Sequence, residues 1–232
     1  MEKRNKKEII TRQLLTVAAD LHVREAAEGE APSRVIAGRA ILFNVPSRPL
    51  WEDEDEQACE IIAPEAITRE VLDACDIKFT MFHDRQLILA RSNMGKGTLS
   101  YDVDDKGVSF EFEAPNTVDG DKALELVRRG DLAGCSFMFS THYWDEGFVT
   151  RAVEIKDGKA YITYTVRQVT GIYDFTLAAD PAYPDTSVEA REFAAELREA
   201  AKPEAPAPTT DKEKVRAQLR EMRNAANTKL QV

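Results

Sequence analysis

The sequence predicts a mainly β fold with inserted helices: a closed or nearly closed, mostly antiparallel β-barrel flanked by helices. Apolar and polar residues alternate along about nine short segments, which is the pattern of half-buried strands. Turn sequences such as Asp104-Asp105-Lys106-Gly107 and Asp157-Gly158 lie between these segments and favour hairpins. Many short strands joined by such turns are typical of barrels rather than of alternating α/β folds.

The expected elements follow one another along the chain. Strands are expected at 14–23, 35–43, 77–82, 99–103, 108–112, 133–140 and about 172–178, with a hairpin over 149–168. A helix is expected over 64–75, where Pro64 suits the first turn, and another over 119–129, which Gly130 ends. A third covers 188–201. Residues 52–56 are five adjacent carboxylates that repel one another, which predicts a solvated loop rather than a metal site.

The charge is unevenly distributed. The net charge is −10, but residues 1–12 and 201–232 each carry +3, which leaves −16 for residues 13–200. An acidic body argues against a DNA-reading domain, whose surface is basic. We expect a basic segment at 1–12, a barrel domain at 13–201, and a Pro/Ala linker with a basic tail at 202–232 that is flexible or removed by self-cleavage.

Targeting signals and cysteine pairs are not evident. No apolar run approaches the about 18 residues of a membrane span, and the charged first residues do not lead into a signal peptide. We therefore expect a cytoplasmic protein. Cys59, Cys75 and Cys135 are odd in number and widely spaced, which predicts buried free thiols rather than disulfides or a zinc site.

Three residues are candidates for chemistry. His83 directly follows an apolar strand, where site residues are often displayed. Ser136 can act as a nucleophile if a histidine accepts its proton, although Met138 replaces the second glycine of the GxSxG motif and so argues against an α/β-hydrolase. Asp174 lies within an apolar strand. It either faces solvent or accepts the proton on the far ring nitrogen of His83.

Four segments carry a resemblance to a known family: Gly38–Asn44, Phe82–Asp84, Gly130–Phe139, and Asp174–Leu177 leading to Pro181–Thr186. In this order they resemble the tailed-phage prohead proteases, maturation serine proteases related in fold to the herpesvirus assemblins. The resemblance runs from about 35 to 188, and implies that Ser136 is the nucleophile and His83 the general base.

The third member of the site has two candidates. The family often has glutamate where this chain has Asp174, and the herpesvirus enzymes use a second histidine, which makes His142 the alternative. A continuous strand over 136–142 would separate His142 from Ser136 by about 20 Å, which favours Asp174. His22 lies before the matched region and is expected to be structural or exposed.

Cys135 competes with Ser136 because a thiol is the better intrinsic nucleophile. Strand alternation points the two side chains to opposite faces, so only one can face His83, and the resemblance selects Ser136. The oxyanion hole stays open between backbone N–H groups beside Gly134 or after His83. Three arginines can assist there, namely Arg85, Arg91 and Arg151.

The resemblance implies a serine endopeptidase that works inside an assembling procapsid in the host cytoplasm. Its substrates and partners would be the major capsid protein and the scaffolding protein or segment, together with its own chain. Self-association is expected, and no cofactor, metal, membrane or specific nucleic acid. Two alternatives stay open: a non-catalytic capsid-assembly module on the same barrel, and a different hydrolase.

Overall fold

The computed structural model describes residues 8–16, 20–26, 28–29, 31–179 and 195–199. The chain divides into two compact units, Met1–Ala194 and Ala195–Val232. In the second unit the described residues, 195–199, are helical, within the helix predicted for 188–201. The linker and tail predicted for 202–232 lie outside the described residues, as does most of the basic segment 1–12.

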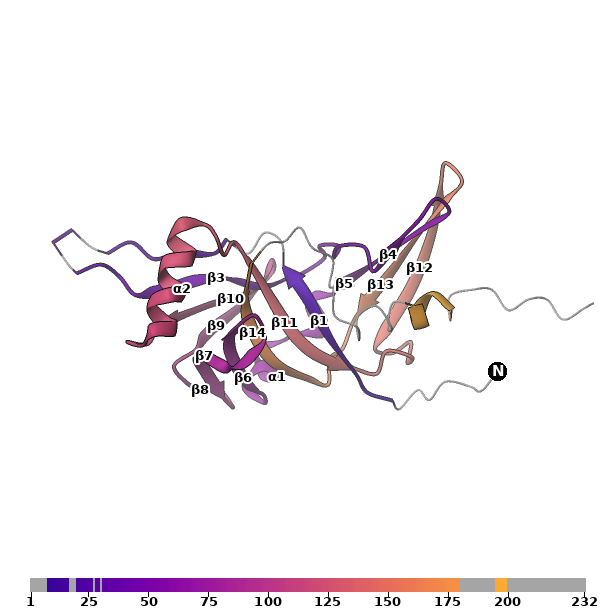
Figure 1. The fold of residues 1–232 in the computed structure, drawn as a ribbon. Coiled ribbons are helices and arrows are strands. Elements are labelled where there is room, and N and C mark those ends of the chain that lie inside the picture. The colour runs from indigo at the N-terminus through magenta and orange to yellow at the C-terminus, as the bar shows by residue number, and fades with distance from the viewer. Residues whose placement is uncertain (1–7, 17–19, 27, 30, 180–194, 200–232) are drawn as a thin grey trace, which may run out of the picture. The chain divides into compact units, whose positions relative to one another are not determined.

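The largest sheet has six strands in the order β1-β11-β14-β6-β7-β8 (Figure 1). Their bounds are β1 Ile10–Thr16, β11 Gly134–Thr141, β14 Gly171–Ala178, β6 Asp76–Met81, β7 Asp84–Asn93 and β8 Lys96–Gly97. β14 lies between β11 and β6 and pairs antiparallel with the first and parallel with the second. The last strand of the described residues is therefore near the centre of this sheet.

Two smaller sheets have four strands each. One has the order β2-β3-β10-β9 and the other β12-β13-β5-β4. Their bounds are β2 His22–Val23, β3 Val35–Leu42, β10 Gly107–Glu113, β9 Ser100–Asp104, β12 Val149–Lys156, β13 Lys159–Val166, β5 Glu56–Ile62 and β4 Trp51–Glu52. Among the described strands, β5 with β13 and β6 with β14 pair in parallel, and the remaining pairs are antiparallel. The predicted mainly β class is confirmed.

The helices are few and short: η1 Pro64–Ala66, α1 Arg69–Asp73 and α2 Val118–Arg129. α2 ends at Gly130 in the left-handed region, as predicted. The single helix predicted for 64–75 is wrong. Ile67 is extended and ends η1, and the Thr68 side chain then caps α1 by accepting the N–H of Val71. In the described residues no helix is long and apolar enough to cross a membrane.

Two strand predictions also need correction. The strand predicted over 14–23 is two strands in different sheets, since β1 pairs with β11 and β2 with β3, and Asp20 between them has a φ of 45°. β7 was not predicted. It pairs with β6 through a two-residue turn, Phe82-His83, which contains none of the usual turn residues.

An aromatic cluster joins two of the sheets. Phe79 on β6 lies 4.5 Å, between ring centroids, from both Phe110 and Phe112 on β10. Phe175 on β14 packs edge-on against Phe79 at 6.5 Å. All four rings are buried. The core therefore covers one face of the six-stranded sheet, and residues that alternate with these phenylalanines lie on the other face.

Candidate active site

The face of the six-stranded sheet opposite the aromatic core carries a row of polar side chains. Ser136 on β11 is paired with Thr176 on β14, which is in turn paired with Thr80 on β6. Asp174 lies two residues before Thr176 and so projects from the same face. His83 follows β6 directly. Three adjacent strands thus place Ser136, Asp174 and His83 at one end of one face.

The structure brings these three predicted residues into a continuous hydrogen-bonded chain. His83 Nε2 lies 2.9 Å from Ser136 Oγ, and His83 Nδ1 lies 2.9 Å from Asp174 Oδ1. Ser136 is 6% exposed and Asp174 only 2%. A hydroxyl, an imidazole and a carboxylate in this order can transfer a proton from the oxygen to the ring, with the carboxylate orienting the ring.

The turn that carries His83 is conformationally unusual. Phe82 and His83 have φ values of 58° and 57°, although neither is glycine. Two-residue hairpin turns with both φ values positive normally take Asn-Gly or similar pairs. Other residues adopt this region at a cost of about 1–3 kcal/mol each, and such strain persists only where neighbouring groups hold it.

Thr176 is one of the groups that hold this turn. The His83 N–H donates to Thr176 Oγ1 at 2.9 Å, and the Phe82 N–H donates to the Leu177 carbonyl at 3.1 Å. Thr80 Oγ1 also donates to Thr176 Oγ1, at 2.9 Å, and both threonines are fully buried. Thr176 was not among the site residues predicted from the sequence. Its position two residues after Asp174, on the same face of an apolar strand, was the available signal.

Ser136 has a second partner from the start of the chain. Its Oγ lies 3.0 Å from the Leu14 carbonyl oxygen, because β1 runs antiparallel along β11 with Leu15 opposite Ser136. This contact depends on pairing between strands more than 100 residues apart, and nothing in the local sequence indicates it.

Cys135 has no access to His83. Its side chain is fully buried on the opposite face of β11, and burial raises the pKa of the thiol to about 12. The thiol is therefore neutral at ordinary pH and a poor nucleophile. Cys59 and Cys75 are half-buried rather than buried as predicted, and all three cysteines are free thiols in the structure.

The other two histidines lie elsewhere. The His142 ring packs edge-on against Phe148 at 4.7 Å, and its Nδ1 lies 3.3 Å from the Glu8 carbonyl oxygen. His142 follows the end of β11, so the uninterrupted strand separates it from Ser136. His22 is exposed, with Nδ1 2.8 Å from the Asp20 carbonyl oxygen. Neither is part of the chain formed by Ser136, His83 and Asp174.

The arginines considered for an oxyanion hole are not directed to Ser136 by any contact in the described structure. Arg91 binds Asp76 through Nε and Nη2, at 2.6 and 2.8 Å, and these bonds, with one from Lys78, lower the pKa of Asp76 to about 2. Arg85 and Arg151 are exposed on β7 and β12.

The acidic run at 52–56 covers the last residue of β4, the turn at 53–55 and the first residue of β5, so the solvated loop predicted there is confined to the turn. The Asp53 carboxylate accepts the N–H groups of Asp55 and Glu56, at 2.9 Å each. In the described part of the chain there is no group of three or more His, Cys, Asp or Glu side chains placed to hold a metal ion.

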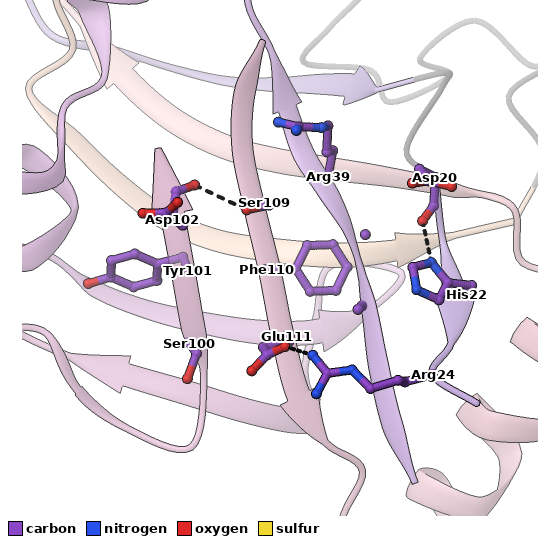
Figure 2. Close-up of a pocket in the computed structure, with 12 residues that line it drawn as sticks. Asp20, His22, Arg24, Arg39, Ser100, Tyr101, Asp102, Ser109, Phe110 and Glu111 are labelled. Atoms are coloured by element: carbon purple, nitrogen blue, oxygen red, sulfur yellow. Dashed lines mark hydrogen bonds and ion pairs between the residues drawn. The ribbon is translucent and has the colours of Figure 1, made fainter. Parts of the chain in front are cut away.

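A groove of about 460 Å³ crosses the sheet β2-β3-β10-β9 (Figure 2). His22 and Asp20 lie at one side of it, and Arg24, which also lines it, forms an ion pair with Glu111. None of the three residues of the hydrogen-bonded chain lines this groove. Arg39, which also lines the groove, pairs instead with Asp104 outside it. Because it contains none of those three residues, the groove is separate from the candidate active site.

Comparison with known proteins gives a family match and a distant structural likeness. The family model described as caudovirus prohead serine protease matches residues 19–201. The fold is similar to that of the bacteriophage T4 capsid assembly protease, gp21, at 9% sequence identity and a TM-score of 0.38, over 74% of this chain and 99% of that one. No curated protein matches the chain by sequence. The range matched by the family model includes Ser136, His83 and Asp174 and begins after β1.

Proposed function

Since the chain belongs to the caudovirus prohead serine protease family, we propose that it is a procapsid maturation endopeptidase whose nucleophile is Ser136, whose general base is His83 and whose orienting carboxylate is Asp174. The observation that carries this assignment is the chain of two 2.9 Å contacts from Ser136 Oγ through the His83 ring to Asp174. His142, the alternative third member, packs against Phe148 instead.

The chemistry follows from the order of these groups. His83 Nε2 accepts the Ser136 proton as Oγ attacks the scissile carbonyl, and the proton then passes to the leaving amine. An acyl-enzyme remains, which water hydrolyses with His83 acting again as base. Asp174 accepts the Nδ1–H bond, which fixes the reactive tautomer and stabilises the imidazolium. Because Asp174 is almost completely buried, water screens its interaction with the ring only weakly.

The substrates and setting of this activity are proposed from the family. They are the scaffolding protein or the scaffolding segment of the major capsid protein, cut inside the assembling procapsid in the host cytoplasm. The protease would contact the same proteins and associate with itself, and would trim its own chain within 200–232.

We also propose that the sheets close into the barrel expected from the sequence. The segment that follows β3 supports this, because it bonds to two sheets in succession. The N–H of Phe43 donates to Lys106 beside β10, and the N–H groups of Asn44 and Ser47 donate to Ile62 and Glu60 of β5.

The direct test is to replace Ser136 with alanine and co-express the variant with its capsid proteins. We expect processing to fall by about 10⁴-fold or more, since removal of a triad serine leaves only the residual effect of binding. Ser140→Ala is the matched control. Ser140 lies on the same face of β11, bonded to Thr170 and Tyr173 rather than to His83. Undiminished processing by Ser136→Ala would refute the assignment.

The same variants distinguish the non-catalytic alternative. A fluorophosphonate probe should label Ser136 in the wild type and in Ser140→Ala, and should not label Ser136→Ala. A capsid-assembly module without catalysis would not be labelled in any of the three.

A further inference from the structure

Strand β12 is a long, uninterrupted strand at the end of its sheet. It has eight residues, and its pairing with β13 continues without a bulge from Val149 opposite Val166 to Lys156 opposite Lys159. In the described structure no strand pairs with its other side. Three of the other strands that end a sheet, β2, β4 and β8, have only two residues each. An edge as long as that of β12 is a place where a further strand can add.

The side chains of β12 are open to solvent on both faces. Every residue from Arg151 to Lys156 is exposed. Val153 and Ile155 project from the same face, and they are 47% and 74% exposed. Figure 1 shows the hairpin of β12 and β13 projecting from the rest of its sheet. Covering these β-branched apolar side chains would favour the addition of another strand.

The main-chain groups of Ile155 and Val153 point away from β13. The turn at 157–158 has two residues, both with positive φ, so Lys156 and Lys159 beside it form a hydrogen-bonded pair. Hydrogen-bonded and non-hydrogen-bonded pairs alternate along an antiparallel ladder. Ile155 and Val153 therefore belong to non-hydrogen-bonded pairs, and their N–H and C=O groups face the open side of β12.

The charges on β12 limit how it can pair with a second copy of itself. Two copies of one strand related by a two-fold axis pair antiparallel, and the residue on the axis faces its own copy. An axis at Arg151, Glu154 or Lys156 would place like charges directly opposite each other, which is destabilising. An axis at Ala152 or Val153 would place each of these charges opposite an uncharged residue.

An axis at Ile155 makes β12 complementary to itself. Glu154 of one copy then lies opposite Lys156 of the other, and by symmetry this pair forms twice. The two Ile155 side chains lie opposite each other on the other face of the joined sheet. Within one chain Lys156 Nζ lies 3.2 Å from Glu154 Oε2, and the two side chains are 62% and 66% exposed. Both charges are therefore accessible to a second copy.

We propose that β12 is a self-association strand, through which two copies of this chain pair antiparallel about Ile155 and join their four-stranded sheets. The proposal rests on the proposed function for its setting, because it names the surface by which the protease would associate with itself in the procapsid. Because a single strand pair buries little surface, the dimer is weak and forms where the protein is concentrated. β12 carries none of the three proposed catalytic residues.

Reversing the two charges separately and together tests the proposal in the full-length chain. All of these proteins carry Ser136→Ala, so that self-cleavage does not change their mass. Glu154→Lys and Lys156→Glu each place like charges opposite each other across the axis. The double variant, Glu154→Lys with Lys156→Glu, restores opposite charges. An equimolar mixture of the two single variants also restores them, because each supplies the charge that the other lacks.

The readout is the dissociation constant of the dimer, measured by sedimentation equilibrium at low salt. We expect each single variant to self-associate at least about tenfold more weakly than the Ser136→Ala parent, because like charges then meet twice. The double variant and the mixture should dimerise like the parent. The differences should shrink in about 0.5 M salt. Lys96→Glu, which reverses an exposed charge on the edge strand β8, is the matched control and should leave the dimer unchanged.

A parent protein that stays monomeric at about 0.2 mM would overturn the proposal and leave β12 to a strand of another protein. Single variants that dimerise as tightly as the parent, or a mixture that does not restore the dimer, would overturn it as well.

Fluorophosphonate labelling of the same charge variants with Ser136 intact judges the proposed function separately. Normal labelling without dimers would refute the self-association strand alone. Dimers that respond to the charges as expected, in a chain whose Ser136 is never labelled, would refute the protease and keep the interface.

Discussion

Replacing Thr176 with valine should shift the position of the proposed general base, His83, without changing the catalytic groups themselves. Valine has nearly the shape of threonine but no hydrogen-bonding oxygen. The change removes the acceptor for the His83 N–H and for the Thr80 hydroxyl, which both lie 2.9 Å from Thr176 Oγ1. Residue 176 touches neither Ser136 Oγ nor the ring nitrogens of His83 in the hydrogen-bonded chain. Any loss of rate would therefore arise through the turn.

The size of the effect can be worked out from these two bonds. A donor left without a partner in a buried site costs about 1–3 kcal/mol, so two donors cost about 2–6 kcal/mol. That is a substantial part of the about 5–15 kcal/mol that stabilises a typical protein, so the melting temperature must be measured beside the rate. The positive φ values of Phe82 and His83 mean that the turn can relax once the bond is lost. A shift of the base by about 1 Å is enough to lower the rate about 10²-fold.

The assay combines the labelling rate of Ser136 with the melting temperature. Thr176→Ser keeps the acceptor and should react within a few-fold of wild type. Thr80→Val is the matched control, because Thr80 is equally buried but its loss leaves the His83 N–H bonded. It should be less stable than wild type and react at nearly the wild-type rate. If Thr176→Val also reacts at the wild-type rate, the turn does not depend on Thr176.

Three further predictions concern the site and the tail. Asp174→Asn should keep the fold and lower the cleavage rate about 10⁴-fold, because an amide favours the wrong His83 tautomer; a rate within tenfold of wild type would remove Asp174 from the site. Cys135 should resist alkylation by iodoacetamide in the native protein at pH 8 and react after unfolding, as judged by peptide mass, because burial raises the pKa of its thiol to about 12; rapid native labelling would contradict its burial. Intact-mass measurement should show wild type shortened within 200–232 and Ser136→Ala at full length, whereas identical full-length masses would argue against self-trimming.

The alternation of apolar and polar residues predicted much of the fold because it follows directly from which side chains are buried. The alternation along β3, β10, β11 and β14 and the helix that ends at Gly130 lie close to their predicted positions. β7 was missed because its turn, Phe82-His83, uses two residues that rarely adopt positive φ, so the composition gave no turn signal. The interruption between β1 and β2 was missed because alternation continues through residues that belong to different sheets.

The candidate site also contains residues that the sequence predicted and residues that it did not. His83, Ser136 and Asp174 were proposed from strand ends, alternation and family resemblance, and the structure brings their side chains together. Thr176 and the Leu14 carbonyl were not proposed. Their contacts are made by register between distant strands, and a main-chain oxygen carries no sequence signal at all.

The place of β14 in the six-stranded sheet sets the moment at which the site can exist. β14 is the last of the described strands to be made, yet it bridges β11 and β6, which are separated along the chain by more than 50 residues. Until β14 has left the ribosome and inserted between them, Ser136 and His83 are not held in one sheet, and Asp174 is missing from the site. A nascent or truncated chain that lacks this strand therefore lacks the hydrogen-bonded chain of the candidate site, which can form only after translation has passed residue 178. The order of synthesis itself delays the assembly of the candidate site.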